Sequence, residues 1–419
     1  MRAGTAASSR WRSIAINTAL ALISAAVAAA GIEALLAAAK VNTKLSVTFD
    51  PATGIGRVPN GCYVYTKEGF SQGCFNEGGF RDKRRTRAKP EGTFRILVLG
   101  DSFGEALEVA LESTFPAIME RELNGGPDGG RFEVLNLSQQ GLGTTDEYLR
   151  YVHEGQCYDP DVVIVAFFAG NDIRNNSESL NHGRPGCYFV LDGTGGLALD
   201  RTPLDRHIAA MPWRRRALIR IKQKSFLVSF VLERVTYLKR LAGVAPAGIE
   251  EEESGEGGNR ESVGDSSYYA VYRPGTSRPW EEAYEITRQV FLKFKDAVEA
   301  DGAQLVLVLV PGAEQVYGEQ GRRLNQRFGI DFDFERPNRI VESYAREAGI
   351  PCLDLAPAFA AHQQRTGEYL HGFGGRHSGH WNEKGHSLAA GEIVRFLKAS
   401  CPGVERERAG FGNNCGEGT

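Results

Sequence analysis

A single serine, Ser102, stands where a strand would deliver a nucleophile. The apolar run 94–99 leads into Gly100-Asp101-Ser102, and the following stretch 105–111 reads as a helix. The carboxyl ends of strands carry the chemistry in open α/β sheets, and a helix that begins there points backbone N–H groups at a bound anion. Asp101 can cap that helix. Ser102 is therefore a candidate nucleophile, with a plain capped turn as the alternative interpretation.

Three further groups of polar and glycine residues lie downstream in positions that could join Ser102. Two of them follow apolar runs at 132–136 and 161–168, and the third is a histidine-rich segment at 377–386. A free serine hydroxyl is a poor nucleophile at neutral pH, and a histidine within hydrogen-bond reach is the common activating base. A histidine of the segment 377–386 could therefore activate Ser102.

The Ser102 segment and the three downstream groups form four blocks, numbered here in chain order. In this order they resemble the four blocks of the SGNH hydrolases, also called GDSL-type esterases. The resemblance covers roughly residues 76–398 and is interrupted by an insertion. It implies that Ser102 is the nucleophile and His380 the general base. It also implies three donors to an oxyanion: the backbone N–H groups of Ser102 and Gly141 and the side chain of Asn171. It implies no cofactor and no metal.

Two departures from the family pattern stand out. Ala169 replaces the first glycine of the third block, which leaves the asparagine in register. In the fourth block, His377 and Ser378 occupy the positions where an aspartate is expected before His380. The sequence therefore predicts that a backbone carbonyl, or a carboxylate from another loop, orients His380. The enzyme would then work as a Ser102–His380 dyad.

Two other classes of function are open at this point. The histidines could instead bind zinc, although their glycine-rich surroundings oppose a rigid helix and no His-Glu-x-x-His pattern occurs. They are His371, His377, His380 and His386. The missing acid also permits a non-catalytic protein that keeps the fold and binds carbohydrate or acts as a scaffold.

Helices and apolar strands alternate through the second half of the chain, which favours a parallel sheet with right-handed crossovers. Together with the resemblance, this predicts a three-layer α/β/α sandwich with a parallel flavodoxin-like sheet. The predicted helices are 280–300, 340–348 and 386–399, and the predicted strands are 304–310 and 350–354.

Composition fits one sizeable enzyme domain with additions. Of the 419 residues, 42% are hydrophobic and 24% charged, and the formal net charge of −3 gives no general affinity for nucleic acid. Four parts are expected: an anchor or signal sequence (1–39), an extracytoplasmic lead-in (40–92), a hydrolase-type domain (93–400) with an insertion (173–280), and a C-terminal tail (401–419).

The amino terminus predicts the compartment. Arg2, Arg10 and Arg12 precede an uncharged apolar run at 13–32. Such a run can span a bilayer, and the arginines hold its start in the cytoplasm. We therefore expect a membrane anchor with the rest of the chain in the periplasm or at the cell surface. A cleaved signal peptide and a buried helix of a soluble protein are the alternatives.

Seven cysteines agree with export to an oxidising compartment. Cys352 lies in an apolar strand and is expected to be a small buried hydrophobe. The other six suggest three pairs: Cys62 with Cys74, Cys401 with Cys415, and Cys157 with Cys187.

The insertion contains two contrasting segments. Residues 213–241 interleave cations with apolar side chains and could lie on an anionic membrane or bind an acidic polymer. A lid helix with a solvated basic face is the alternative. The acidic, Gly- and Ser-rich run 250–267 reads as a disordered loop.

Taken together, the sequence predicts an extracytoplasmic serine esterase. Its substrate would be an O-acyl or O-acetyl group on a cell-surface glycan, or a small ester, with a lipid ester as the alternative. The acceptor, water or a sugar hydroxyl, and the oligomeric state stay open.

Overall fold

The chain divides into two compact units, Met1–Leu45 with Pro212–Pro246, and Ser46–Met211 with Ala247–Thr419. Both come from a computed structural model. It describes residues 3–40, 45–48, 50, 52–125, 132–181, 184–241, 267–401 and 403–404.

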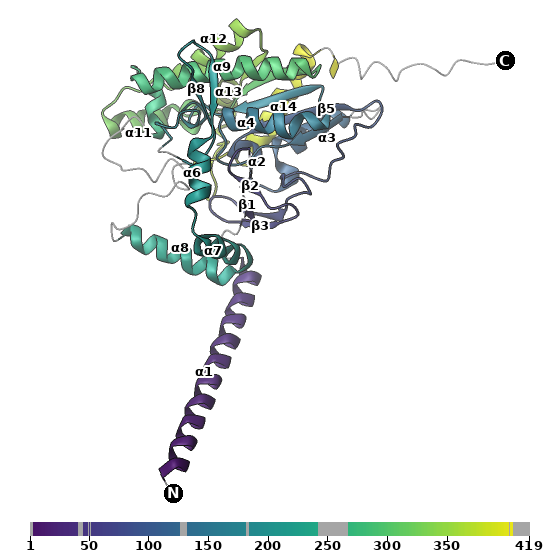
Figure 1. Ribbon diagram of the computed structural model, residues 1–419. Coiled ribbons are helices and arrows are strands. Elements are labelled where there is room, and N and C mark those ends of the chain that lie inside the picture. The colour runs from purple at the N-terminus through teal and green to yellow at the C-terminus, as the bar shows by residue number, and fades with distance from the viewer. Residues whose placement is uncertain are drawn as a thin grey trace, which may run out of the picture. The chain divides into compact units, whose positions relative to one another are not determined.

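The first unit consists of three helices (Figure 1): α1 (Ala3–Ala39), α7 (Trp213–Lys224) and α8 (Phe226–Leu241). Within α1, the stretch Trp11–Ala39 is mostly exposed and has a mean hydropathy of 2.1. This stretch is long and apolar enough to cross a membrane, and it contains the predicted run 13–32.

The second unit is built on a five-stranded parallel sheet with the strand order β11-β10-β7-β5-β6. This is the flavodoxin-like order, in which the first strand lies between the second and the third. The predicted fold class is confirmed. The strands are β5 (Phe94–Gly100), β6 (Phe132–Asn136), β7 (Val162–Phe167), β10 (Gln304–Leu309) and β11 (Cys352–Asp354).

Three antiparallel strand pairs accompany the sheet: β1 (Val47–Thr48) with β2 (Gly56–Arg57), β3 (Cys62–Tyr65) with β4 (Ser71–Cys74), and β8 (Tyr188–Leu191) with β9 (Leu197–Asp200). The lead-in at 46–92 supplies the first two of these pairs. It is therefore part of the same compact unit as the sheet.

Helices cover both faces of the sheet (Figure 1). On one face pack α4 (Thr144–His153), α9 (Arg278–Ala300) and α12 (Arg336–Ala348), and on the other α3 (Phe115–Asn124), α13 (Ala356–Thr366) and α14 (Glu383–Ser400). Shorter elements complete the unit: α2 (Ser102–Glu105), α5 (Asp172–Asn175), α6 (Thr202–Ala210), α10 (Ala313–Val316), α11 (Gly318–Phe328), and the 3₁₀ turns Leu111–Ser113, Gly155–Tyr158 and Tyr268–Tyr272.

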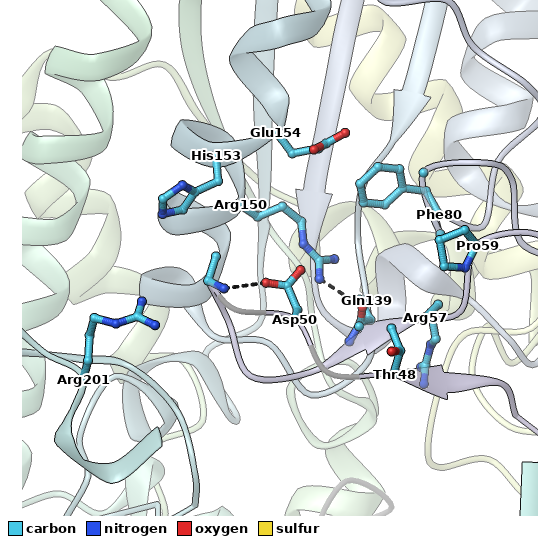
Figure 2. Close-up of a pocket in the computed structure, with 14 residues that line it drawn as sticks. Thr48, Asp50, Arg57, Pro59, Phe80, Gln139, Arg150, His153, Glu154 and Arg201 are labelled. Atoms are coloured by element: carbon cyan, nitrogen blue, oxygen red, sulfur yellow. Dashed lines mark hydrogen bonds between the residues drawn. The ribbon is translucent and has the colours of Figure 1, made fainter. Parts of the chain in front are cut away.

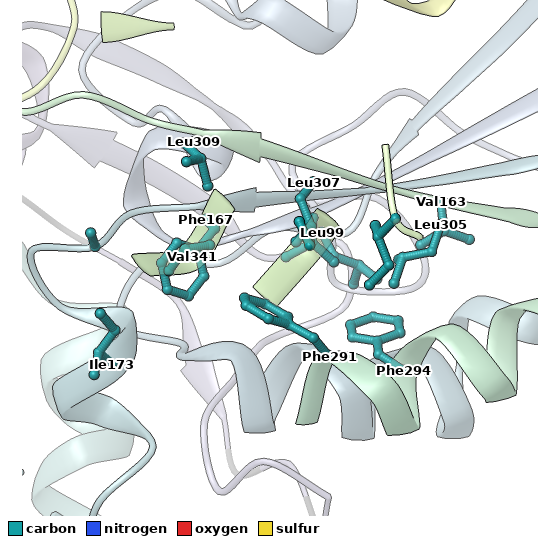
Figure 3. Packing of buried hydrophobic residues seen from close by; sticks show 14 of the residues in the cluster. Leu99, Val163, Phe167, Ile173, Phe291, Phe294, Leu305, Leu307, Leu309 and Val341 are labelled. Atoms are coloured by element: carbon teal, nitrogen blue, oxygen red, sulfur yellow. The ribbon is translucent and has the colours of Figure 1, made fainter. Parts of the chain in front are cut away.

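Apolar residues at nearly every position of the central strands explain the three layers. Side chains alternate across a strand, so Leu97 and Leu99 enter one core while Ile96 and Val98 enter the other. Figure 3 shows the first core, where β10 packs against phenylalanines of α9. Each such side chain stabilises the fold by about 1.5–3 kcal/mol through burial.

The helix predicted at 105–111 is wrong. Only α2 forms, because Ala106 adopts a left-handed conformation with φ 52° and ends it. The buried guanidinium of Arg81 then bonds the freed backbone. It donates to the carbonyl oxygens of Glu105 at 2.8 Å and of Val109 at 2.5 Å, and also to that of Ala106. Residues 106–110 therefore form a clamped loop rather than a helix.

The cysteines behave partly as predicted. The disulfide between Cys62 and Cys74 is confirmed. The pairing of Cys157 with Cys187 is wrong, because Cys157 is exposed while Cys187 is buried and donates its thiol to a backbone carbonyl. Burial raises the pKa of Cys352 to about 12, as befits an unreactive thiol. Cys415 and nearly all of the predicted loop 250–267 lie outside the described residues.

Candidate active site

Ser102 and His380 meet at the carboxyl end of the sheet. Ser102 begins α2 directly after β5, and its Oγ lies 2.8 Å from Nε2 of His380. The other ring nitrogen of His380, Nδ1, lies 2.9 Å from Oε1 of Glu68. All three side chains are largely buried. A carboxylate at Nδ1 places the proton there, so that Nε2 can accept the serine proton.

Glu68 comes from the turn of the β3–β4 hairpin, which the Cys62–Cys74 disulfide closes. Its second oxygen, Oε2, accepts the backbone N–H of His380 at 3.0 Å. The approach requires a glycine before the histidine: Gly379 has φ 89°, and a Cβ there would lie 2.6 Å from Glu68 Oε2. Glu68 of the hairpin therefore contacts both the ring and the backbone of His380.

A dyad is accordingly the wrong description of this arrangement. Of the two partners predicted for His380, the structure has the carboxylate from another loop, and it lies 312 residues away in sequence. Sequence patterning gave little sign of it. The available signal was a glutamate beside a glycine, midway between two cysteines spaced for a hairpin.

A second carboxylate approaches the same ring nitrogen. Oε1 of Glu108, in the loop clamped by Arg81, lies 3.4 Å from Nδ1 of His380. Burial raises the pKa of Glu108. Burial also opposes a charge on His380, but the carboxylates of Glu108 and Glu68 outweigh it, so the pKa of the histidine is raised above its usual value.

Asn171 is tied to the residue before the nucleophile. Its Nδ2 donates to Asp101 Oδ2 at 2.9 Å, while Asp101 Oδ1 accepts the backbone N–H of Phe103 at 2.9 Å. Asp101 thus caps α2 as predicted and also orients the asparagine. An amide nitrogen carries two N–H groups, so Asn171 retains one that can donate to an oxyanion.

Gly141 lies in the loop after β6 with φ 83°, a conformation that favours glycine. Buried groups hold this loop on two sides. Arg184 donates to the carbonyl oxygen of Gly141, and the backbone N–H of Gln140 donates to Glu105 at 2.8 Å. Glu105 in turn forms a buried ion pair with Arg57. A loop fixed in this way can present its N–H without reorganisation.

A cavity of about 430 Å³ lies behind the same loop (Figure 2). Arg150, one of its lining residues, donates to Gln139 Oε1 at 2.9 Å and to the carbonyl oxygen of Leu137 at 2.8 Å. Ser102 and His380 do not line this cavity. Through these two bonds, the guanidinium of Arg150 supports the loop that carries Gly141.

A smaller cavity of about 300 Å³ adjoins His380. Aromatic side chains and polar groups share its wall, a mixture found in ligand sites. The lining residues are Phe103, Phe168, Tyr268, Tyr269, Gly312, Ala313, Glu314, Gln320, Arg323, Leu324, Arg327, Ser378 and Gly379.

The remaining histidines do not converge with His380 on one point. His371 is buried between the Tyr317 hydroxyl, 2.9 Å from Nδ1, and the carbonyl oxygen of Pro311, 3.0 Å from Nε2. His377 is exposed and stacks on Tyr369. His386 lies inside α14, where burial lowers its pKa to about 3. His371 and His377 thus have polar or aromatic partners of their own, and the ring of His386 stacks on Phe115.

Comparison with protein families agrees with this geometry. Residues 276–412 match the model described as "SGNH hydrolase-like domain, acetyltransferase AlgX", a region that includes His380. This part of the chain is therefore similar to the SGNH hydrolases. The match covers the fourth block of the SGNH pattern and leaves the first three outside it.

Two solved structures show a limited similarity to this chain. A catalytic mutant of Axe2, an acetylxylan esterase from Geobacillus stearothermophilus, is 12% identical, with 73% of this chain and 94% of that chain covered and a TM-score of 0.37. A putative lipolytic protein of the G-D-S-L family from Desulfitobacterium hafniense is 14% identical, with 72% and 99% covered and a TM-score of 0.35. Curated proteins gave no match.

Replacing Glu68 and Glu108 one at a time should show which carboxylate supports His380 during catalysis. We expect Glu68→Gln to lower kcat by about 10²- to 10⁴-fold, because an amide no longer holds the imidazolium that forms during the reaction. Glu108→Gln should lower kcat by less than about tenfold, because its oxygen lies 3.4 Å from Nδ1 of His380, beyond the usual hydrogen-bond distance. Steady-state kinetics on the two variants checks this; the reverse ranking would make Glu108 the partner.

The same two carboxylates should shape the pH profile. His380 can act as a base only when neutral, and its pKa is raised. The rate constant kcat/KM should therefore rise with pH through an acidic limb lying above about pH 6.5, the ordinary value for histidine. Glu108→Gln removes one source of the shift and should move the limb to lower pH. A limb that stays in place would contradict the electrostatic coupling.

Replacing Asn171 tests the oxyanion site. We expect Asn171→Ala to lower kcat by about a hundredfold or more, since one such donor contributes roughly 3 kcal/mol to the transition state. The fold should persist, because Asp101 keeps its bond to Phe103. Kinetics together with a melting curve checks both parts. A normal kcat at an unchanged Tm would remove Asn171 from the site.

Proposed function

We propose that the chain is an extracytoplasmic serine esterase that hydrolyses or transfers O-acyl groups, foremost O-acetyl, through an acyl-enzyme on Ser102. The observation that carries this proposal is the continuous hydrogen-bonded line from Ser102 through His380 to Glu68, with distances of 2.8 and 2.9 Å. That line supplies the carboxylate whose apparent absence had motivated a non-catalytic interpretation.

In this mechanism, Ser102 Oγ attacks the ester carbonyl while His380 Nε2 takes the hydroxyl proton. The backbone N–H groups of Ser102 and Gly141 and the amide of Asn171 stabilise the oxyanion. His380 then protonates the departing alcohol, which leaves an acyl-Ser102. Water or a sugar hydroxyl, deprotonated by His380, attacks this ester, and collapse of the second tetrahedral intermediate returns the serine. Glu68 stabilises the imidazolium in both halves.

A carbohydrate substrate is supported by the cavity beside His380. Tyr268 and Tyr269 offer aromatic surface there, and Gln320 and Arg323 offer hydrogen-bond donors, all in about 300 Å³. A lipid ester would instead require a predominantly apolar path for the acyl chain. The described lining alternates polar with aromatic groups, which favours a short acyl group on a polar alcohol.

Hydrolysis of p-nitrophenyl acetate and of an acetylated oligosaccharide tests the proposal. We expect activity on both that resists EDTA and falls as the acyl chain of p-nitrophenyl esters lengthens. Release of acetate as against acetylated acceptor, measured with excess oligosaccharide, separates hydrolysis from transfer. Loss of activity with EDTA would support the zinc alternative, and a preference for long acyl chains would support a lipid ester.

Topology forms part of the proposal. Because arginines precede the apolar part of α1, the rest of the chain should be extracytoplasmic. We expect an alkaline phosphatase fusion placed after Lys40 to be active in a bacterial host. The matched fusion after Arg12 should be inactive. An inactive alkaline phosphatase fusion after Lys40, together with an active cytoplasmic reporter fused at the same residue, would show that the orientation is the opposite one.

A further inference from the structure

Glu33, the first charged residue after the apolar part of α1, joins that helix to α8. Its Oε1 accepts the backbone N–H of Phe226 at 2.7 Å, and its Oε2 accepts the hydroxyl of Ser225 at 2.7 Å and the backbone N–H of Leu227 at 2.8 Å. The carboxylate thus satisfies the unpaired N–H groups at the start of α8 and complements its dipole. The junction of α7 and α8 is therefore fixed at the level of Glu33.

That level corresponds to the surface of a bilayer. The uncharged run 13–32 has twenty residues, which at 1.5 Å per residue span about 30 Å, the thickness of the hydrocarbon core. If α1 crosses the membrane as proposed, Glu33 lies where hydrocarbon meets headgroups. The α7–α8 junction must lie there too.

The two helices carry side chains suited to that boundary. Among the described residues, all but four of the exposed large apolar side chains lie on α1, α7 and α8. Trp213, at the start of α7, is 73% exposed. Helix α7 contains six cationic residues and no acidic residue. The cationic residues are Arg214, Arg215, Arg216, Arg220, Lys222 and Lys224.

We propose that α7 and α8 lie in the headgroup layer of the membrane that α1 crosses and bind anionic phospholipid there. The inference rests on the proposed anchor and is independent of the esterase chemistry. Cations in such a helix attract anionic headgroups, while the apolar side chains enter the layer beneath. An acidic polymer in water would satisfy the cations and leave Trp213, Leu218 and Ile221 exposed, which is why lipid is favoured.

Hydrogen exchange on the full chain in nanodiscs tests the proposal. One set of discs contains phosphatidylcholine alone, and the other contains phosphatidylglycerol as well. We expect the backbone amides of 213–241 to exchange at least about tenfold more slowly in the anionic discs, and salt to reverse the difference. The triple variant Arg214→Glu/Arg215→Glu/Arg216→Glu should abolish it.

A matched triple variant controls for net charge. Arg121, Arg346 and Arg365 are exposed cations on α3, α12 and α13, and reversing all three should leave the protection of 213–241 intact. Equal exchange in both kinds of disc would overturn the proposal. So would equal protection by soluble heparin in neutral discs, which would make an acidic polymer the partner. A chain that fails to enter discs but hydrolyses p-nitrophenyl acetate would refute the anchor, and the inference with it, while leaving the esterase proposal standing.

Discussion

Replacing His380 with alanine should lower kcat/KM by about 10⁴-fold or more, whereas His377→Ala should keep most of the activity. Of these two histidines, His380 alone has one ring nitrogen on Ser102 and the other on a carboxylate. Loss of a base that acts as a unit with its nucleophile removes nearly all of their joint contribution. His377 is exposed, and its ring stacks on Tyr369 without reaching the serine.

Kinetics on both variants, with melting curves to verify folding, provides the check. His377→Ala is the matched control, because it removes the same side chain three residues away. A dispensable His380 beside an essential His377 would mean that the base assignment and the alignment of this segment are both wrong.

The second large effect is expected at Ser102. Ser102→Ala should lower kcat to about 10⁻⁴ of the wild-type value or less, because it removes the hydroxyl that would form the covalent intermediate. The substitution deletes one oxygen atom and leaves the backbone N–H of the oxyanion site in place. Its Tm should therefore stay close to that of the wild type.

Ser343→Ala is the matched control for this variant, since Ser343 lies on α12 and its hydroxyl bonds only the local backbone at Ile340. It should retain full activity. Turnover in the Ser102→Ala variant at an appreciable fraction of the wild-type rate would show that the nucleophile is another group.

Much of the fold was accessible from the sequence because the sheet is buried on both faces. A strand such as Gln304–Leu309 must then be apolar at nearly every position, and that run stands out against the periodic helices around it. The alternation of helix and strand predicts that the strands are parallel, whereas their flavodoxin-like order was implied by the family resemblance. The polar residues at strand ends, Ser102 and Asn171 among them, follow in turn because parallel strands bring these ends to one edge.

The acid beside His380 could not be predicted in the same way. Glu68 belongs to a two-stranded hairpin outside the sheet, and no local pattern relates its position to a histidine more than three hundred residues away. The prediction of a helix at 105–111 failed for a related reason. The sequence of this segment favours a helix, but the carbonyl groups bond to Arg81 instead, so a tertiary contact overrides local propensity.

The sequence also did not show that part of the insertion, residues 212–246, belongs to the same compact unit as α1. Residues 213–241 read as a basic, partly apolar helix whatever they pack against. Their association with α1 includes the hydrogen bonds of one carboxylate, Glu33, which in the sequence marks no more than the end of an apolar run.

The central claim, an acyl-enzyme on Ser102, can be tested by trapping it. The protein would be mixed with p-nitrophenyl acetate, quenched in acid within a turnover, digested, and analysed by mass spectrometry. The account predicts one acetyl group on the peptide that contains Ser102, present in the wild type, accumulating in a variant slow to deacylate, and absent from Ser102→Ala. Acetate release at full rate with no acetyl group on that peptide, or an acetyl group on a different residue, would contradict it.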